Sequence, residues 1–228
     1  MTRVDENRKV RPILSDIEFD LLLVQARVFP FHFLALRNTA ILCMIRITGK
    51  RRKEISSLTR RDVFLEKNRL AINFKLLKKS HRKILPDGTI KPASPPPNKV
   101  RYIPFKDPLV PPILEYKEYI DKHYKESKEF WLHVRPVFGQ YIVYPNKGIQ
   151  GRQIYNVVRK TGDMAGVTVW PHLFRETAGA EEIIRDPTPM GMSKVMTRID
   201  VTERTAWNYV ERYVTSVIDR EYEEKNPE

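Results

Sequence analysis

Apolar residues recur at helical spacing along most of the chain. Residues 13–29 open with Ser15 as a capping residue and Glu18 three positions later, which completes a capping box. Residues 33–47 are largely apolar and end at Thr48-Gly49, where glycine is a usual helix stop. The same spacing predicts further helices at 52–57, 109–124, 150–164, 173–185, 190–199 and 203–220.

Two segments alternate between apolar and polar residues and are predicted to be strands. They cover residues 70–76 and, more loosely, residues 100–105. Between them, residues 78–99 contain Pro86-Asp87-Gly88 and the run Pro95-Pro96-Pro97. This stretch is too proline-rich and polar to pack, so we expect a long, flexible hairpin connection. The predicted fold class is mainly α with a small antiparallel β-sheet (α+β).

The chain contains no internal repeat, and its length suits one good-sized core or two small ones. We expect a single domain over residues 12–220, preceded by an N-terminal extension at 1–11. Residues 221–228 form a charged C-terminal tail that is expected to fray.

Composition narrows the class of protein. Hydrophobic residues make up 41% and charged residues 30%, as in a soluble globular protein. No apolar run approaches the roughly 20 residues that span a bilayer, and no apolar segment at the N-terminus suggests a secretory signal. A single cysteine, Cys43, excludes an internal disulfide and a cysteine-based zinc site, and its apolar surroundings predict a buried residue. We expect an intracellular protein without a membrane partner.

The formal net charge is +13. Such a surplus favours a polyanion, because Lys and Arg side chains release the counterions condensed on it. Ribosomal and membrane-surface proteins share this property, so charge alone does not name the function.

Three separated motifs carry the candidate chemistry. The first is Thr48-Gly49-Lys50-Arg51-Arg52-Lys53-Glu54, the second is Pro171-His172-Leu173-Phe174-Arg175, and the third runs from Thr205 to Tyr209. Guanidinium groups hold both non-bridging oxygens of a phosphodiester and stabilise the charge that builds in its transition state. A tyrosine can attack the phosphorus and store the bond energy in a phosphotyrosyl link.

In this order the motifs resemble the active site of the tyrosine recombinases, the phage-integrase family. That family carries Thr-Gly-x-Arg-x-x-Glu, then His-x-x-Arg after a proline, and finally Thr-x-x-x-Tyr. An Ala-Gly-Val segment at 165–167 precedes the second motif, as it does in many integrases. The resemblance extends from about Pro12 to Val217.

The resemblance implies a role for each motif residue. Tyr209 would be the nucleophile, with Tyr213 as its competitor one helical turn later. Arg51, His172 and Arg175 would hold the scissile phosphate, and Glu54 would orient Arg51. The reaction needs no metal and no cofactor.

The chain departs from the family pattern at two places. Lys50 replaces a residue that is usually apolar, and no Gly-His pair precedes Tyr209. Alignment of the neighbouring apolar residues places Arg198 at the missing histidine, whereas counting back from the tyrosine places Asp200 there. Arg198 is preferred, because an aspartate would repel the phosphate. Some archaeal viral integrases also carry a basic residue there, which suggests a mobile element such as an archaeal virus or plasmid.

The family also carries a lysine on a hairpin, which protonates the leaving 5′-oxygen. Lys75, Lys78 and Lys79 all lie where the first predicted strand ends. Lys78 continues the alternating face of Ile72 and Phe74, and it is therefore our prediction for this role.

The resemblance thus predicts a site-specific DNA recombinase or integrase, acting on double-stranded DNA in the cytoplasm or nucleoid of a host cell. We expect a tetramer on DNA with exchange of C-terminal helices. Few residues precede the first predicted helix, so we expect either an excised catalytic domain or a minimal recombinase without the separate N-terminal DNA-clamping domain of most relatives. A type IB topoisomerase and a non-catalytic DNA-binding protein derived from an integrase are the alternatives.

Overall fold

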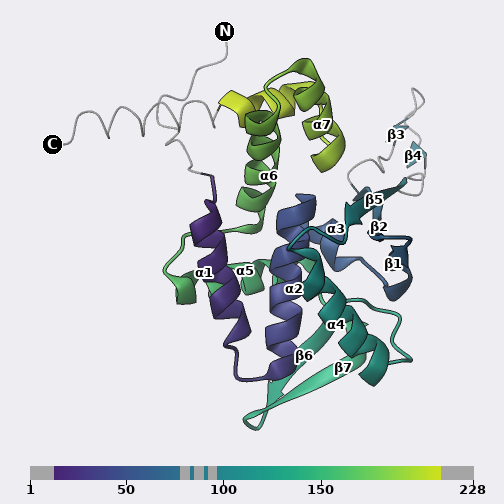
Figure 1. The fold of residues 1–228 in the computed structure, drawn as a ribbon. Coiled ribbons are helices and arrows are strands. Elements are labelled where there is room, and N and C mark those ends of the chain that lie inside the picture. Colours follow the sequence, from purple (N-terminus) through teal and green to yellow (C-terminus); the bar gives the residue numbers. More distant parts are fainter. Residues whose placement is uncertain (1–12, 78–82, 85–89, 92–96, 212–228) are drawn as a thin grey trace, which may run out of the picture.

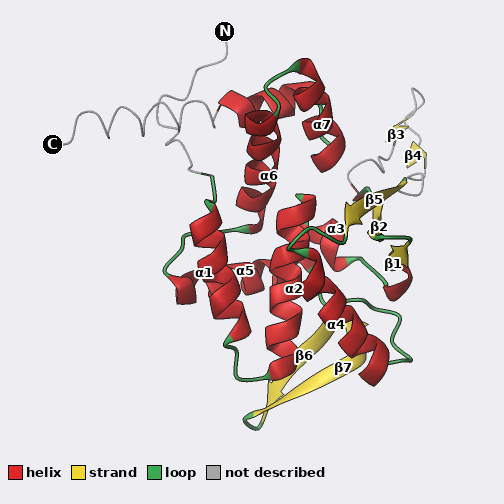
Figure 2. Ribbon diagram, in the orientation of Figure 1, coloured by secondary structure: helices red, strands yellow, loops and turns green. Residues whose placement is uncertain are grey.

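The computed structural model describes residues 13–77, 83–84, 90–91 and 97–211. It is mainly helical with small antiparallel sheets, which confirms the predicted fold class (Figures 1 and 2). Its elements, in chain order, are α1 (Asp16–Arg27), α2 (His32–Thr48), α3 (Arg52–Ser56), a 3-10 turn (Arg60–Asp62), β1 (Val63–Glu66), β2 (Arg69–Lys75), β3 (Lys83–Ile84), β4 (Ile90–Lys91), β5 (Asn98–Pro104), α4 (Val110–His123), β6 (Leu132–Val137), β7 (Gln140–Gly148), α5 (Gly151–Ala165), α6 (Pro171–Arg185) and α7 (Pro189–Ile199). Residues 203–211 are also helical.

The predicted helices are confirmed to within a few residues over the described part of the chain. The capping box is present, since Ser15 Oγ accepts from Glu18 N at 3.2 Å and Glu18 Oε2 accepts from Ser15 N at 2.8 Å. The extension at 1–11, the end of the last helix at 212–220 and the tail at 221–228 lie outside the described residues.

Helix α2 is the centre of the molecule, and α1, α4 and α6 pack against it (Figure 1). Every residue from Leu36 to Lys50 is buried, including the polar Arg37, Asn38 and Arg46, so α2 is enclosed on all sides. Trp131 links α3 to this core, because its indole nitrogen donates to Ile55 O at 2.8 Å. The end of α3 is therefore tied to the buried Trp131.

The turn between α2 and α3 requires glycine. Gly49 ends α2 in the left-handed region with φ of 60°, and its N–H donates to Ile45 O. A Cβ on Gly49 would lie 2.6 Å from Ile199 Cγ2 at the end of α7. The backbone of the Thr48–Arg51 segment thus touches the C-terminal part of α7, which lies far away in sequence.

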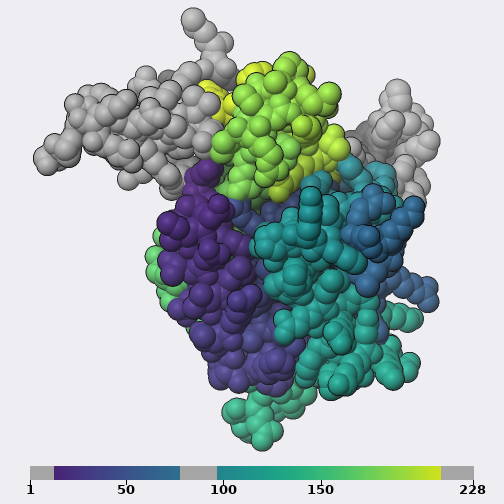
Figure 3. Space-filling model, viewed as in Figure 1, coloured from purple at the N-terminus to yellow at the C-terminus, as the bar shows by residue number. Residues whose placement is uncertain are grey.

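A second, smaller apolar cluster joins the outer half of α6 to α7 and to residues 203–211. Its buried members are Ala178, Met192, Val195, Ile199, Ala206 and Tyr209. In the space-filling view this part forms one end of the molecule, beyond α1 and α4 (Figure 3).

The three-stranded sheet has the order β1-β2-β5, and both pairs are antiparallel. It confirms the two predicted strands, although β1 was not predicted. The predicted connection at 78–99 needs a correction, because Asn98 and Lys99 belong to β5 and pair with Lys75 and Phe74. β3 and β4 form a short ladder within the connection.

The hairpin of β6 and β7 was not predicted either. Its strands contain Pro136 and Pro145, and proline disfavours a strand because it cannot donate to the ladder. Phe138 and Gly139 form its turn with φ of 47° and 80°, in place of the Asn-Gly pair that usually marks such a turn. No helix in the described part of the chain is both long enough and apolar enough to cross a membrane.

Cys43 is expected to be unreactive in the folded protein. It is fully buried in α2, and burial raises the pKa of its thiol to about 12, so the reactive thiolate is scarce at neutral pH. Labelling with a thiol reagent at pH 7.5 should be absent in buffer and complete in denaturant. Rapid labelling of the native protein would contradict this packing of α2.

Candidate active site

The first motif forms the corner between α2 and α3. Arg51 is the N-cap residue of α3, and its side chain is 31% exposed. The Glu54 carboxylate is buried and accepts from Arg51 N at 3.0 Å and from Arg51 Nη1 at 3.3 Å. This contact within one helical turn orients the Arg51 guanidinium.

The second motif begins α6, with Pro171 in the first turn. His172 and Arg175 lie three positions apart on this helix, but their environments differ. His172 is 55% exposed, and its Nε2 lies 3.5 Å from Glu176 Oε1. Arg175 is only 1% exposed.

The Arg175 guanidinium links three segments of the chain. Nη1 donates to Gly49 O at 2.8 Å, and Nη2 donates to the carbonyl oxygens of Ile199 and Asp200. Burial lowers the pKa of Arg175 and the nearby Arg51 lowers it further, whereas the Tyr209 hydroxyl raises it by hydrogen bonding. Arg175 therefore lies close to both Arg51 and Tyr209.

Tyr209 lies in the helical segment 203–211 and is 7% exposed. Its ring meets the ring of His172 edge-on, with 6.2 Å between the ring centroids. Gly179 makes room for Tyr209, since a Cβ there would lie 3.1 Å from Tyr209 Cδ2. The competing Tyr213 lies outside the described residues.

These side chains meet in one cavity of about 780 Å³. Arg51, Glu54, His172, Arg175 and Tyr209 line it, although they come from three distant parts of the sequence. The remaining wall comes from Leu76, Lys99, Met196, Thr197, Asp200, Val201, Thr202, Thr205 and Asn208.

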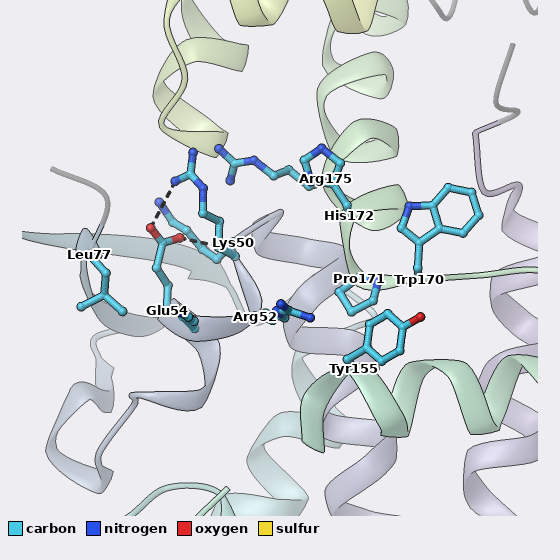
Figure 4. A pocket seen from close by; sticks show the side chains of 11 residues that line it. Lys50, Arg52, Glu54, Leu77, Tyr155, Trp170, Pro171, His172 and Arg175 are labelled. Atoms are coloured by element: carbon cyan, nitrogen blue, oxygen red, sulfur yellow. Dashed lines mark hydrogen bonds and ion pairs between the residues drawn. The ribbon is translucent and has the colours of Figure 1, made fainter. Parts of the chain in front are cut away.

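A second cavity of about 530 Å³ adjoins the first and shares Arg51, Glu54, His172 and Arg175 with it. Figure 4 shows this cavity, with Arg175 extending from α6 toward Lys50 and Glu54, and with Tyr155 and Trp170 on the opposite side. Because the shared residues line both cavities, they lie where an extended ligand can pass between them.

Arg198 does not join this group. Its Nη1 pairs with Glu182 Oε2 at 3.1 Å and its Nη2 donates to Ile47 O at 3.3 Å, away from Tyr209. Asp200, the other candidate for the histidine position, does line the cavity of Tyr209.

Of the three hairpin lysines, only Lys75 is described. It is exposed at the end of β2 and does not line either cavity. Lys78 and Lys79 lie outside the described residues.

Two lysines that the motif analysis did not assign do reach the site. Lys50 is 1% exposed and contacts the Asp200 carboxylate. Burial lowers the pKa of the Lys50 ammonium and neighbouring cations such as Lys99 lower it further, whereas the Glu54 carboxylate raises it. Lys99 is 35% exposed and pairs with Asp200 Oδ1 at 2.7 Å. The sequence signals for this cluster were the two departures from the family pattern, Lys50 and Asp200 at the position of the missing histidine.

Several solved structures share this fold, and they include recombinases and integrases. XerH site-specific recombinase bound to palindromic difH substrate, in a post-cleavage complex, matches with a TM-score of 0.66 and 12% identity over 98% of this chain and 56% of that chain. XerA recombinase matches with a TM-score of 0.61 and 16% identity, over 99% of this chain and 69% of that chain. The Tn1549 transposon integrase in complex with transposon right end DNA matches with a TM-score of 0.53 and 15% identity, over 95% of this chain and 68% of that chain.

The fold is thus that of the tyrosine recombinases and integrases. The chain spans about half the length of the two XerH chains that it matches, 56% of one and 50% of the other. No protein-family model matches the sequence, and no curated protein matches it.

Proposed function

We propose that this protein is a site-specific DNA recombinase or integrase that cuts and rejoins DNA strands through a 3′-phosphotyrosyl link. The observation that carries the proposal is the single cavity lined by Arg51, His172, Arg175 and Tyr209. Two guanidiniums beside a tyrosine suit a phosphodiester, because they stabilise the charge that develops while the phenol attacks.

In the proposed reaction, the Tyr209 oxygen attacks the phosphorus, and the bond to the 5′-oxygen breaks as that oxygen takes a proton from the hairpin lysine, for which Lys78 is our candidate. Arg51 and Arg175 hold the non-bridging oxygens, and Glu54 keeps Arg51 oriented. His172 lies beside Tyr209 and can take up the phenolic proton as the new bond forms. Attack by a 5′-hydroxyl on the phosphotyrosyl link reverses these steps and rejoins a strand.

The partner in this proposal is double-stranded DNA, which fits the net charge of +13. We propose further that copies assemble on DNA as a tetramer and exchange their C-terminal helices. One structure of the same fold is a lambda integrase dimer bound to a COC′ core site, matching with a TM-score of 0.51 and 12% identity over 92% of this chain and 50% of that chain.

A covalent-adduct assay tests the function. The protein is incubated with fluorescent nicked duplexes whose central sequence is randomised, so that the cleaved strand loses its short 5′-hydroxyl fragment. A denaturing gel should show a protein–DNA adduct, and mass spectrometry should place the DNA on Tyr209. Binding without any adduct would favour the non-catalytic DNA-binding protein. An adduct together with plasmid relaxation, but without joining of two duplexes, would favour the type IB topoisomerase.

The leaving-group proton gives a separate prediction for the hairpin lysine. Lys78→Ala should slow cleavage of ordinary DNA by about 10²–10⁴-fold. A substrate whose 5′ leaving oxygen is replaced by sulfur should restore the rate, because a thiolate leaves without a proton.

The same measurement on Lys75→Ala and Lys79→Ala serves as the comparison. Rescue by sulfur in only one of these variants would move the role to that lysine. If sulfur rescues none of the three, the hairpin lysine has no part in the mechanism.

A further inference from the structure

The two departures from the family motif meet in the structure. Lys50 stands at a usually apolar position of the first motif, and Asp200 is nine positions before Tyr209, where counting back from the tyrosine places the missing histidine. In the fold, the Lys50 ammonium contacts Asp200 Oδ2, and both side chains are almost completely buried. Two unusual residues from distant segments are therefore partners in one ion pair.

A third residue extends this pair to the cavity. Lys99 of β5 donates to Asp200 Oδ1 at 2.7 Å and to Thr197 O at 2.6 Å. Its ammonium is thus held at the C-terminal end of α7, where the helix dipole favours a positive charge. Lys99 is 35% exposed and lines the same cavity as Tyr209.

The charges of this cluster explain why an aspartate is tolerated here. Asp200 carries one negative charge between two lysines, Lys50 and Lys99. Burial lowers the pKa of Lys50 to about 7, so Lys50 is fully charged only below that pH, where it balances Asp200 and leaves the positive charge of Lys99 as a surplus. Lys50 is 1% exposed whereas Lys99 is 35% exposed, so the surplus charge faces the cavity through Lys99. If Lys50 were absent, the negative charge of Asp200 would cancel the positive charge of Lys99.

The backbone fixes the position of Asp200. It ends α7 in the left-handed region with φ of 51° and ψ of 61°, which aspartate and asparagine adopt more readily than most residues. Arg175 also donates to Asp200 O at 3.5 Å. Asparagine at this position therefore keeps the backbone while it removes the charge.

We propose that Lys99 binds the scissile phosphate in place of the missing histidine, and that the buried Lys50–Asp200 pair is a positioning unit that holds its ammonium toward the cavity. This inference rests on the proposed function. It assigns the positive charge that the sequence placed at Arg198 of α7 to Lys99 of β5.

The test compares Lys99→Ala, Asp200→Asn and the double variant in single-turnover cleavage of the nicked duplex pool. Lys99→Ala should slow cleavage about 100-fold with both the 5′-oxygen and the 5′-sulfur substrate, as expected for loss of a donor to the phosphate. Asp200→Asn should cause part of this loss, and the double variant should be no slower than Lys99→Ala. Lys117→Ala, which breaks a surface lysine–aspartate pair on α4, is the matched control and should cleave normally.

Three results would overturn the proposal. Sulfur rescue of Lys99→Ala would make Lys99 a proton donor instead of a phosphate ligand. Additive effects in the double variant, or an Asp200→Asn variant with the wild-type rate, would show that Asp200 does not act through Lys99.

Loss of folding is controlled by a second variant. Asp200→Asn leaves Lys50 buried without its carboxylate, so the variant Lys50→Met/Asp200→Asn removes both buried charges. It should recover thermal stability but keep the slow cleavage. Recovery of the full rate together with stability would mean that the pair has only a structural role.

A measurement of DNA binding tests the role of Lys99 without any cleavage step. In fluorescence anisotropy with the uncleaved duplex pool, Lys99→Ala should lower the slope of log Kd against log salt by about one. If the wild type forms no adduct but this change occurs, the proposed recombinase fails while Lys99 remains a phosphate ligand. An unchanged slope would overturn the role of Lys99 whether or not an adduct forms.

Discussion

Replacement of Tyr209 by phenylalanine is expected to abolish the covalent adduct while DNA binding and folding persist. The hydroxyl is needed only for attack on phosphorus, whereas affinity comes from the basic surface. The ring packs with Ala178, Val195 and Ile199 and is 7% exposed, so phenylalanine keeps this packing. The measurements are the adduct on a denaturing gel, the anisotropy of a labelled duplex and the thermal midpoint.

Tyr213→Phe is the matched control and should form the adduct at the wild-type level. If Tyr209→Phe still formed the adduct and Tyr213→Phe did not, the nucleophile would be Tyr213. Tyr209→Ala is a poorer choice, because removal of a buried aromatic ring costs about 3–5 kcal/mol of stability and would confuse the result.

The parts of the site that could be predicted from the sequence depend on local geometry. Arg51 and Glu54 are three positions apart and meet within one turn. His172 and Arg175, also three positions apart on α6, line the same cavity. Helical spacing alone places such pairs side by side. What the motifs could not show is that Arg175 is buried and bonded to the backbone of both Gly49 and Ile199.

The choice of Arg198 over Asp200 illustrates a limit of one-dimensional alignment. Arg198 lies in the last turn of α7, whereas Asp200 follows the helix in the left-handed region, where the chain changes direction. Arg198 faces Glu182 of α6, and Asp200 faces the cavity. In isolation an aspartate would repel the phosphate, but Asp200 contacts Lys50 and Lys99, and these contacts cannot be seen from the sequence.

Those two contacts depend on long-range features. Lys99 reaches Asp200 because β5 pairs with β2 in a register that sets Lys99 opposite Phe74. That register spans the long proline-rich connection, which contains no local pattern that would determine it. Lys50 reaches Asp200 because Gly49 turns the chain against the end of α7. Neither contact can be derived from spacing along the chain.

Arg51→Ala and Arg175→Ala are both expected to slow cleavage by about 10²–10³-fold, since each removes a donor to the transition-state phosphate. Their effects on stability should differ. Arg51 is partly exposed and bonds to Glu54 within its own turn, whereas Arg175 is buried and donates to Gly49 O and Ile199 O. Loss of Arg175 leaves buried carbonyls unpaired, at a cost of about 1–3 kcal/mol each.

Lysine at either position separates charge from geometry. A lysine keeps the positive charge but loses the planar fork that holds two oxygens, so Arg51→Lys and Arg175→Lys should recover little of the cleavage rate. Full activity in one of them would argue against a phosphate clamp at that position. Limited proteolysis supplies the structural readout: Arg175→Ala should expose residues 186–211 to cleavage, because Arg175 bonds the end of α7 to the α2–α3 corner, and Arg51→Ala should not. Equal protection in both variants would show that the carbonyl contacts of Arg175 do not hold this segment in place.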